Sequence, residues 1–312
     1  MHSSLFGFVA LNKPVGMTSH DCVLKIRKIF NIKRVGHGGT LDPLVTGVLP
    51  IALGKATRLL PYLKPSKSYI GTIQLGKKTN TDDLEGKIIE EQPIPTLEEK
   101  KINKILDSFR GEIKQRPPIF SSVHINGERA YKKARRGESF EICEKEVKIY
   151  KLNLLNLEKD TGKISLYISC SSGTYIRSLA RDIGKSIGCG GCLSSLKRVE
   201  ALGFKDNQSI KLSSLEKQEF NKESIIIDPL IAMNHLYKLP LIEEEDNRLW
   251  QTGRKISISQ DQCIKPTSPC QDEANQPIKF SLIINDKDKI IGVGEWESDS
   301  IIKPKIVFNA IG

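Results

Sequence analysis

Along the first 235 residues, short apolar runs alternate with stretches in which apolar residues recur at helical spacing. The apolar runs at 5–11 and 48–54 and the alternating pattern at 69–75 are typical of buried strands. Helical spacing predicts two amphipathic helices, one opened by a Thr18–Asp21 capping box and one that ends at Gly188. Because strands and helices do not alternate regularly, we expect an α+β fold and not a doubly wound sheet.

Three segments carry local turn or cap signals. Residues 34–47 contain four glycines and a proline among few bulky apolar side chains, so this segment is predicted to be a long irregular loop. A capping box of Thr96 and Glu99 predicts another helix, which we expect Gly111 to end. The Asn126–Gly127 dipeptide predicts a tight turn.

The composition of the chain changes near Lys238. Beyond this point, a polar, proline-bearing insertion from Ser259 to Pro277 separates short β-like segments. We therefore expect two domains, a large one at 1–235 and a small, mostly β one at 236–312.

The chain is basic. Lysine and arginine outnumber aspartate and glutamate by 48 to 37, which gives a net charge of +11. This charge favours a polyanionic partner, because binding a nucleic acid releases its counterions. The alternative is a basic protein that its charge keeps soluble. The richly basic stretch Lys114–Arg136 is the part that we expect to be exposed and to face RNA.

Membrane, export and metal signals are weak. No apolar run reaches the roughly 18 residues that a membrane span requires, and the N-terminal apolar patch follows no basic stretch. We therefore expect a soluble, cytoplasmic protein with no membrane partner. The seven cysteines form an odd set, and the Cys189–Cys192 pair has no second pair at zinc-ribbon spacing, so we expect reduced thiols and no metal site.

Three side chains capable of chemistry lie close together in the irregular segment 34–47. They are His37, Thr40 and Asp42. An Asp-Pro pair in a glycine-rich loop is usually a turn former. The length of the segment points instead to a functional loop, because irregular loops on rigid scaffolds often carry binding and catalytic groups.

The motif GHGGTLDPLVTGVLPIALGKATR at 36–58 resembles the catalytic motif of the TruB-type pseudouridine synthases. The resemblance continues in VALNKPVGMTSHDCV (9–23), SYIGTIQLGKKTNTDDLEG (68–86) and SCSSGTYIRSLARDIG (169–184). It implies a catalytic domain at 1–235 whose core is a mixed, largely antiparallel sheet with flanking helices. The tail at 236–312 resembles the PUA-like RNA-binding module of these enzymes.

The same resemblance implies an activity, the isomerisation of the T-loop uridine at position 55 of tRNA to pseudouridine. This reaction breaks the glycosidic bond to N1, rotates the base and rejoins the ribose at C5. It consumes no external reagent, so no cofactor is expected. The implied partner is tRNA, and we expect a monomer with no obligate protein partner.

The resemblance places the catalytic aspartate at Asp42. Its carboxylate could add to C6 of the pyrimidine or act at the ribose, and the sequence leaves both routes open. The implied partner is Arg177, whose charge would keep the carboxylate ionised. Spacing alone favours a solvated arginine on the polar face of its helix. Tyr69 matches an aromatic residue that stacks on the target base, although a strand tyrosine is often only a core residue.

Four further residues match substrate-binding positions of the family. Tyr175 and Leu196 match the base pocket, and ordinary apolar packing is the alternative for both. His37 matches the histidine that helps to hold the flipped nucleotide. Lys13 matches a position beside the active-site loop, where it would contact phosphate or brace the loop of Asp42. The motif reads GHGGTLDP where some relatives carry GHTGALDP, a difference confined to small residues.

Two other functions compete with this interpretation. A non-catalytic tRNA-binding folding chaperone would need the basic surface but would not need Asp42, Arg177 and Tyr69 together. An enzyme that modifies rRNA within a guided complex would keep the same catalytic residues. The bacterial-style C-terminus and the absence of long basic tails favour the tRNA enzyme.

Overall fold

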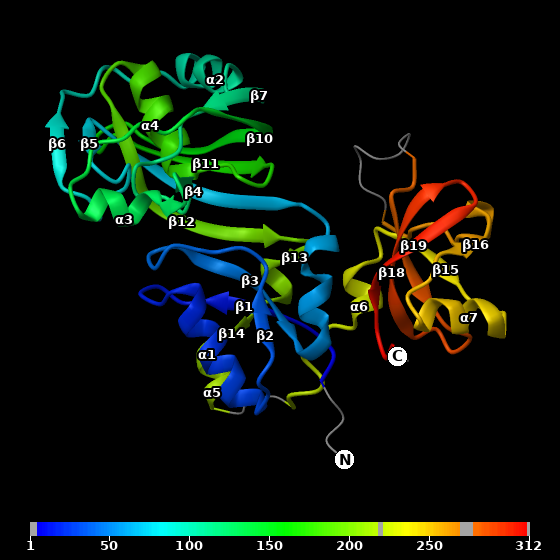
Figure 1. The fold of residues 1–312 in the computed structure, drawn as a ribbon. Coiled ribbons are helices and arrows are strands. Elements are labelled where there is room, and N and C mark those ends of the chain that lie inside the picture. The colour runs from blue at the N-terminus through cyan, green and yellow to red at the C-terminus, as the bar shows by residue number, and fades with distance from the viewer. Residues whose placement is uncertain (1–4, 218–220, 269–276, 311–312) are drawn as a thin grey trace.

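The computed structural model describes residues 5–217, 221–268 and 277–310. Figure 1 shows a large sheet with helices packed against it and a smaller, curled sheet formed by the C-terminal part of the chain. The large sheet and its helices carry the residues discussed below, and the predicted α+β class is confirmed.

The large sheet is mixed and mostly antiparallel. Its strands pair antiparallel except for β1 with β14 and β3 with β12, which run parallel. Along the main path the order is β14 (Ile210–Lys211), β1 (Gly7–Lys13), β3 (Thr46–Leu53), β12 (Gly191–Ala201), β4 (Lys67–Leu75), β11 (Lys163–Cys170), β10 (Lys145–Glu158) and β7 (Gly111–Gln115). Two short strands join it from the side, β2 (Val35–His37) on β3 and β13 (Phe204–Lys205) on β12.

The two helices predicted from apolar spacing are present. Helix α1 (Ser19–Phe30) begins with the predicted capping box between Thr18 and Asp21. Helix α4 (Ile176–Ile187) ends at Gly188, which adopts the left-handed conformation with φ 98° that glycine accepts most easily. The other helical elements within residues 5–217 are α2 (Glu99–Asp107), α3 (Ala130–Arg135), α5 (Leu212–Glu216) and the 3₁₀ segments Gly54–Tyr62 and Asp206–Gln208.

Two local predictions are wrong. The segment 34–47 is not wholly irregular, because β2 forms within it by pairing with β3. Helix α2 does not begin at a Thr96 capping box; Glu98 is its cap, without a side-chain hydrogen bond, and the helix ends before Gly111 starts β7. In the first case strand pairing, and in the second helix packing on β10 and α4, outweighs the local sequence signal.

Two hairpins project from the sheet. Strands β5 (Lys77–Thr79) and β6 (Ile88–Glu91) form one, and β8 (His124–Ile125) and β9 (Glu128–Arg129) form the other. The second hairpin turns at Asn126 and Gly127, both at positive φ, which confirms the predicted tight turn.

The C-terminal sheet has the order β15 (Tyr237–Pro240), β17 (Phe280–Ile284), β18 (Ile290–Ser298), β19 (Ile301–Val307) and β16 (Ile256–Ser257). Helices α6 (Pro229–Ala232) and α7 (Glu244–Gln251) and the 3₁₀ turn Gln260–Gln262 accompany it. One hydrophobic cluster joins this sheet to the first, because Phe8 and Leu59 pack in the same cluster as Leu282 and Val293. Of the polar insertion at 259–277, residues 269–276 lie outside the described ranges, and the domain division at 235/236 stays a prediction.

In the described part of the chain, no helix has both the length and the apolar character needed to cross a membrane. Six of the seven cysteines are described, and all six are free thiols; Cys270 lies outside the described residues.

Candidate active site

Asp42 lies in the loop between β2 and β3, at residues 38–45. Both ends of the loop are tied down. Gly38 N donates to Pro50 O at 2.8 Å, and Val45 N donates to Asp42 O at 3.0 Å. Between them, Leu41 N donates to the Ser19 Oγ at 2.8 Å, which links the loop to the first turn of α1. The loop is therefore irregular, but hydrogen bonds fix it to the rest of the fold.

Gly47 is where β3 meets β12. A Cβ at this position would lie 2.1 Å from Arg198 O, and φ is +99°. Only glycine allows the two strands to approach this closely. Arg198 itself holds the loop from the other strand, since its Nε donates to Val48 O at 2.8 Å and its Nη2 donates to Gly39 O at 3.1 Å.

The Asp42 carboxylate lies beside a guanidinium group. Arg177 Nη2 lies 3.1 Å from Asp42 Oδ2, and the two side chains are 12% and 48% exposed. Two carbonyls orient the arginine, because Nη1 donates to Thr81 O at 3.1 Å and Nη2 to Phe120 O at 3.0 Å. The solvated helix-face position expected from spacing alone is therefore wrong, because residues 81 and 120 cover the first turn of α4.

A second carboxylate shares the arginine. Arg177 Nη1 lies 3.6 Å from Asp83 Oδ2, and Asp83 is only 15% exposed. Asp83 is held in turn by the Thr81 hydroxyl at 2.5 Å and the Glu85 amide at 3.1 Å. Asp83 is not among the residues predicted from the sequence, although it lies in the TNTDDLEG stretch that carries part of the resemblance. One arginine therefore bridges one half-exposed and one mostly buried carboxylate.

Tyr69 lies on β4 directly opposite Arg198 of β12. Its side chain is 6% exposed. Burial raises the pKa of its hydroxyl above the ordinary value, and the nearby positive charge of Arg198 opposes this only in part. The hydroxyl is therefore protonated at neutral pH, and the ring presents a neutral aromatic wall.

A cavity of about 490 Å³ joins these groups. Six of the residues singled out from the sequence line it, namely Thr40, Asp42, Tyr69, Tyr175, Arg177 and Leu196. Asp83, Glu85 and Lys67, which sequence analysis did not single out, line it as well. Apolar and aromatic walls with a few convergent charges are typical of a ligand site.

His37 and Lys13 are not among the residues that line this cavity. Lys13 is fully buried, and its Nζ donates to Pro14 O at 2.8 Å and Pro43 O at 3.0 Å. This geometry corresponds to the bracing alternative for Lys13, since Pro43 follows Asp42. Burial lowers the pKa of His37, and its buried Nδ1 has no hydrogen-bond partner among the described residues.

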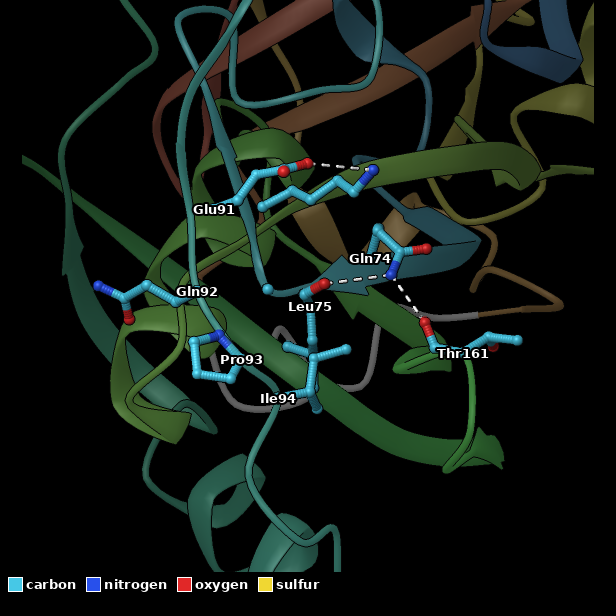
Figure 2. A pocket seen from close by; sticks show the side chains of 9 residues that line it. Gln74, Leu75, Glu91, Gln92, Pro93, Ile94 and Thr161 are labelled. Carbon is cyan, nitrogen blue, oxygen red and sulfur yellow. Dashed lines mark hydrogen bonds and ion pairs between the residues drawn. The ribbon is translucent and has the colours of Figure 1, made fainter.

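A second cavity, of about 550 Å³, lies farther along the sheet (Figure 2). The end of β4, the start of β5 and residues 91–94 line it together with Thr161. Its side-chain donors have partners within the protein. The Gln74 amide donates to Leu75 O at 3.1 Å and to Thr161 O at 2.8 Å, and Lys77 pairs with Glu91 at 3.4 Å.

Within the described ranges, no group of three or more histidine, cysteine, aspartate or glutamate side chains is arranged to hold a metal ion.

Comparison with known proteins gives two matching family models. Residues 27–176 match the N-terminal domain of the TruB family pseudouridylate synthases. Residues 177–235 match the C-terminal domain of tRNA pseudouridylate synthase B. Asp42, Tyr69 and Tyr175 lie in the first match, and Arg177 and Leu196 lie in the second.

Similar proteins of comparable length carry one name. A tRNA pseudouridine synthase B of Prochlorococcus marinus is 52% identical over 313 residues, with 100% of both chains covered. One from a Synechococcus species is 46% identical over 314 residues, with 98% of both covered. Among solved structures, an H/ACA ribonucleoprotein bound to a substrate RNA containing 2'-deoxyuridine has a TM-score of 0.70 at 26% identity, covering 97% of this chain and 85% of that one.

Proposed function

The chain belongs to the TruB family of pseudouridylate synthases, and from that premise we propose that it isomerises the T-loop uridine at position 55 of tRNA, with Asp42 as the nucleophile. The relatives named above supply the tRNA substrate and the reaction class. The observation that carries the assignment of the residue is the Asp42–Arg177 pair at 3.1 Å, on the wall of a cavity of about 490 Å³.

The pair supplies what the reaction needs. The nucleophile must be held in a fixed orientation, and the Arg177 guanidinium, 3.1 Å from Asp42 Oδ2, holds one carboxylate oxygen in place. The carbonyls of Thr81 and Phe120 hold the guanidinium, so it stays beside Asp42 when the substrate binds. Asp42 is half-exposed, so its second oxygen is free to approach the substrate. Addition to C6 and attack at the ribose both use this same oxygen.

The cavity walls suit a single flipped nucleotide. A uridine stacked within the T-loop hides C5 and C1′, so the nucleotide must leave the stack at a cost of a few kcal/mol. Tyr69 offers a buried ring on which the base can stack, and Tyr175 and Leu196 form further apolar wall. We assign these three residues to base binding. His37 and Lys13 would support the loop and the nucleotide from outside the cavity wall.

Affinity for tRNA would come from charge and from the C-terminal region. The net charge of +11 favours phosphate contacts, which fix position without reading sequence. We assign residues 1–235 to catalysis and 236–312 to a PUA-like RNA-binding module. The basic stretch 114–136 would contact the T-arm. The protein would act as a cytoplasmic monomer. It would need no cofactor, because the isomerisation is balanced within the nucleotide itself.

The Asp42–Arg177 pair also separates the competing functions. A chaperone that only remodels tRNA needs neither a carboxylate on a cavity wall nor an arginine that carbonyls hold 3.1 Å from it. An rRNA enzyme within a guided complex would share the site. The full-length relatives at 46–52% identity are named for tRNA, and they support the tRNA substrate for this chain.

The test is pseudouridine mapping by carbodiimide-dependent reverse-transcription stops. An unmodified tRNA transcript is incubated with the purified protein and no added cofactor, beside rRNA fragments of equal length and a transcript with cytidine at position 55. We expect one new stop, at uridine 55 of the first transcript only. Stops that appear on rRNA in preference to tRNA, or tight tRNA binding without any stop, would refute the proposal.

A further inference from the structure

One corner of the 490 Å³ cavity holds positive charge without an acidic partner. Lys67 lies two residues before Tyr69 on β4, so both side chains project from the same face of the strand. A Cβ on Gly39 would lie 3.7 Å from Lys67 Nζ and 3.6 Å from Arg198 Nη1. The ammonium and the guanidinium therefore meet at the backbone of the loop that carries Asp42.

Neither of these nitrogens has an acidic partner among the described residues. The groups that act electrostatically on Lys67 are Arg198, which repels it, and Cys170. Arg198 Nη1 is buried without a close hydrogen bond, and the Tyr69 hydroxyl with which Arg198 interacts is uncharged. Arg198 is fully buried, and its other two nitrogens bind the carbonyls of Val48 and Gly39. The cross-strand neighbour of Lys67 on β11 is Cys170, which offers no charge. Burial raises the pKa of that thiol to about 11, so it is neutral at physiological pH.

Two lysines on other strands of the catalytic region are paired. Lys78 lies 2.7 Å from Glu90, and Lys197 lies 2.5 Å from Asp206. Buried or half-buried charges in proteins are usually paired, because removing a charge from water is costly. An unpaired ammonium on a cavity wall, beside a buried guanidinium, is therefore expected to bind an anionic group of the ligand. A polynucleotide brings phosphates, and each is joined to its base through one sugar.

We propose that Lys67, backed by the charge of Arg198, binds a backbone phosphate adjoining the flipped uridine. This inference rests on the proposed function and adds a requirement to it. The cavity would bind the target uridine through its base and also through a phosphate of the RNA backbone next to it. Tyr69 and Lys67 are then neighbouring contacts on one strand, the first for the base and the second for the phosphate.

The test removes the Lys67 ammonium and the phosphate charge, first one at a time and then together. T-arm stem-loops are made with a neutral methylphosphonate at the linkage 5′ or 3′ of the target uridine. Initial rates at limiting substrate give kcat/KM for the wild type and for Lys67→Met on each RNA. Lys77→Met is the matched control, because Lys77 lines the other cavity and is paired with Glu91. Thermal melting shows that each variant is folded.

We expect Lys67→Met to lower kcat/KM on the unmodified stem-loop by about 10- to 100-fold. One of the two methylphosphonates should lower the wild-type value by a similar factor and leave the Lys67→Met value nearly unchanged, and this linkage identifies the phosphate. The log–log salt slope of binding should also fall by about 0.7 in the variant. Lys77→Met should behave as wild type throughout.

Two results would overturn the inference. In one, neither methylphosphonate affects the wild type. In the other, the losses from Lys67→Met and from the methylphosphonate simply multiply, which means that the two groups do not interact. Failure of the wild type to modify the unsubstituted stem-loop would instead overturn the proposed function, so the two failures are distinguishable.

Discussion

Two cavities along β4 are alike in size but differ in the pairing of their charged groups. One measures about 490 Å³ and the other about 550 Å³, and β4 contributes to both. In the larger, shown in Figure 2, the Gln74 amide and the Lys77 ammonium are bound by groups of the protein itself. In the smaller, Asp42 is half-exposed, Lys67 has no acidic partner among the described residues, and one arginine serves two carboxylates.

This contrast shows that the volume of a cavity does not by itself identify a functional site. A cavity whose polar groups satisfy one another has no free donor or charge for a ligand. A cavity whose charges are incompletely matched is costly to the fold, and such sites are characteristic of function. Substitutions in one cavity should therefore affect activity, and substitutions in the other should affect only stability.

The largest effect is expected from Asp42→Asn. The amide cannot act as a nucleophile, so we expect release of tritium from [5-³H]uridine-labelled tRNA to fall by at least about 10³-fold. Binding of tRNA should remain close to wild type, because the change leaves the basic surface intact. Filter binding gives that control, and turnover at the wild-type rate would contradict the role of Asp42.

Arg177→Lys should lower kcat by about 10²-fold. Lysine keeps the charge, but it lacks the planar fork with which Arg177 reaches Asp42 and the carbonyls of Thr81 and Phe120 together. Single-turnover kinetics separate the chemical step from binding. If only KM changed, the arginine would be a substrate anchor and not the partner of Asp42.

Lys67→Met should stabilise the protein while it lowers activity. Burial lowers the pKa of Lys67, and the charge of Arg198 lowers it further, so the folded state holds this proton less tightly than the unfolded chain. The cost is therefore present below the folded-state pKa and disappears as the pH rises past the unfolded value near 10.5.

We expect a gain of about 1 kcal/mol in the free energy of unfolding at pH 7, shrinking towards pH 10.5. Urea denaturation at several pH values measures it. The paired and exposed Lys77 should give no such gain when changed to Met. Loss of stability in Lys67→Met at neutral pH would show that the ammonium has a partner in the folded protein.

The smallest effect is expected from Gln74→Leu in the second cavity. It removes the hydrogen bonds to Leu75 O and Thr161 O, so the free energy of unfolding should fall by about 1 kcal/mol or less. Because this cavity takes no part in the reaction, kcat and KM should stay within twofold of wild type. A larger loss of activity would assign the second cavity a role in RNA binding.

Much of the fold followed from local patterns in the sequence. The α1 capping box, the stop of α4 at Gly188 and the turn at Asn126 depend on backbone conformations and caps that nearby residues determine. Strand β2 was missed because three residues are too few for a periodic signal, and only its pairing with β3 makes it a strand. The start of α2 was misplaced because packing on β10 and α4, and not a cap, decides it.

For the site, the family resemblance predicted which residues take part, and the structure shows which of them lie in contact. Spacing placed Arg177 on the polar side of its helix but could not show that residues 81 and 120 cover that side. Asp83, Lys67 and Arg198 have no local pattern that marks them. Their place follows from strand register and from a loop folded across the sheet, which are long-range features.

Hydrogen–deuterium exchange on the Asp42→Asn protein, with and without an unmodified T-arm stem-loop, tests the contrast between the cavities most directly. This variant should hold the substrate without converting it. We predict that RNA slows exchange in peptides covering residues 38–45 and 171–175, and leaves peptides covering 91–95 unchanged. Protection at 91–95 without protection at 38–45 would contradict the account, because RNA would then occupy the cavity whose polar groups are already satisfied.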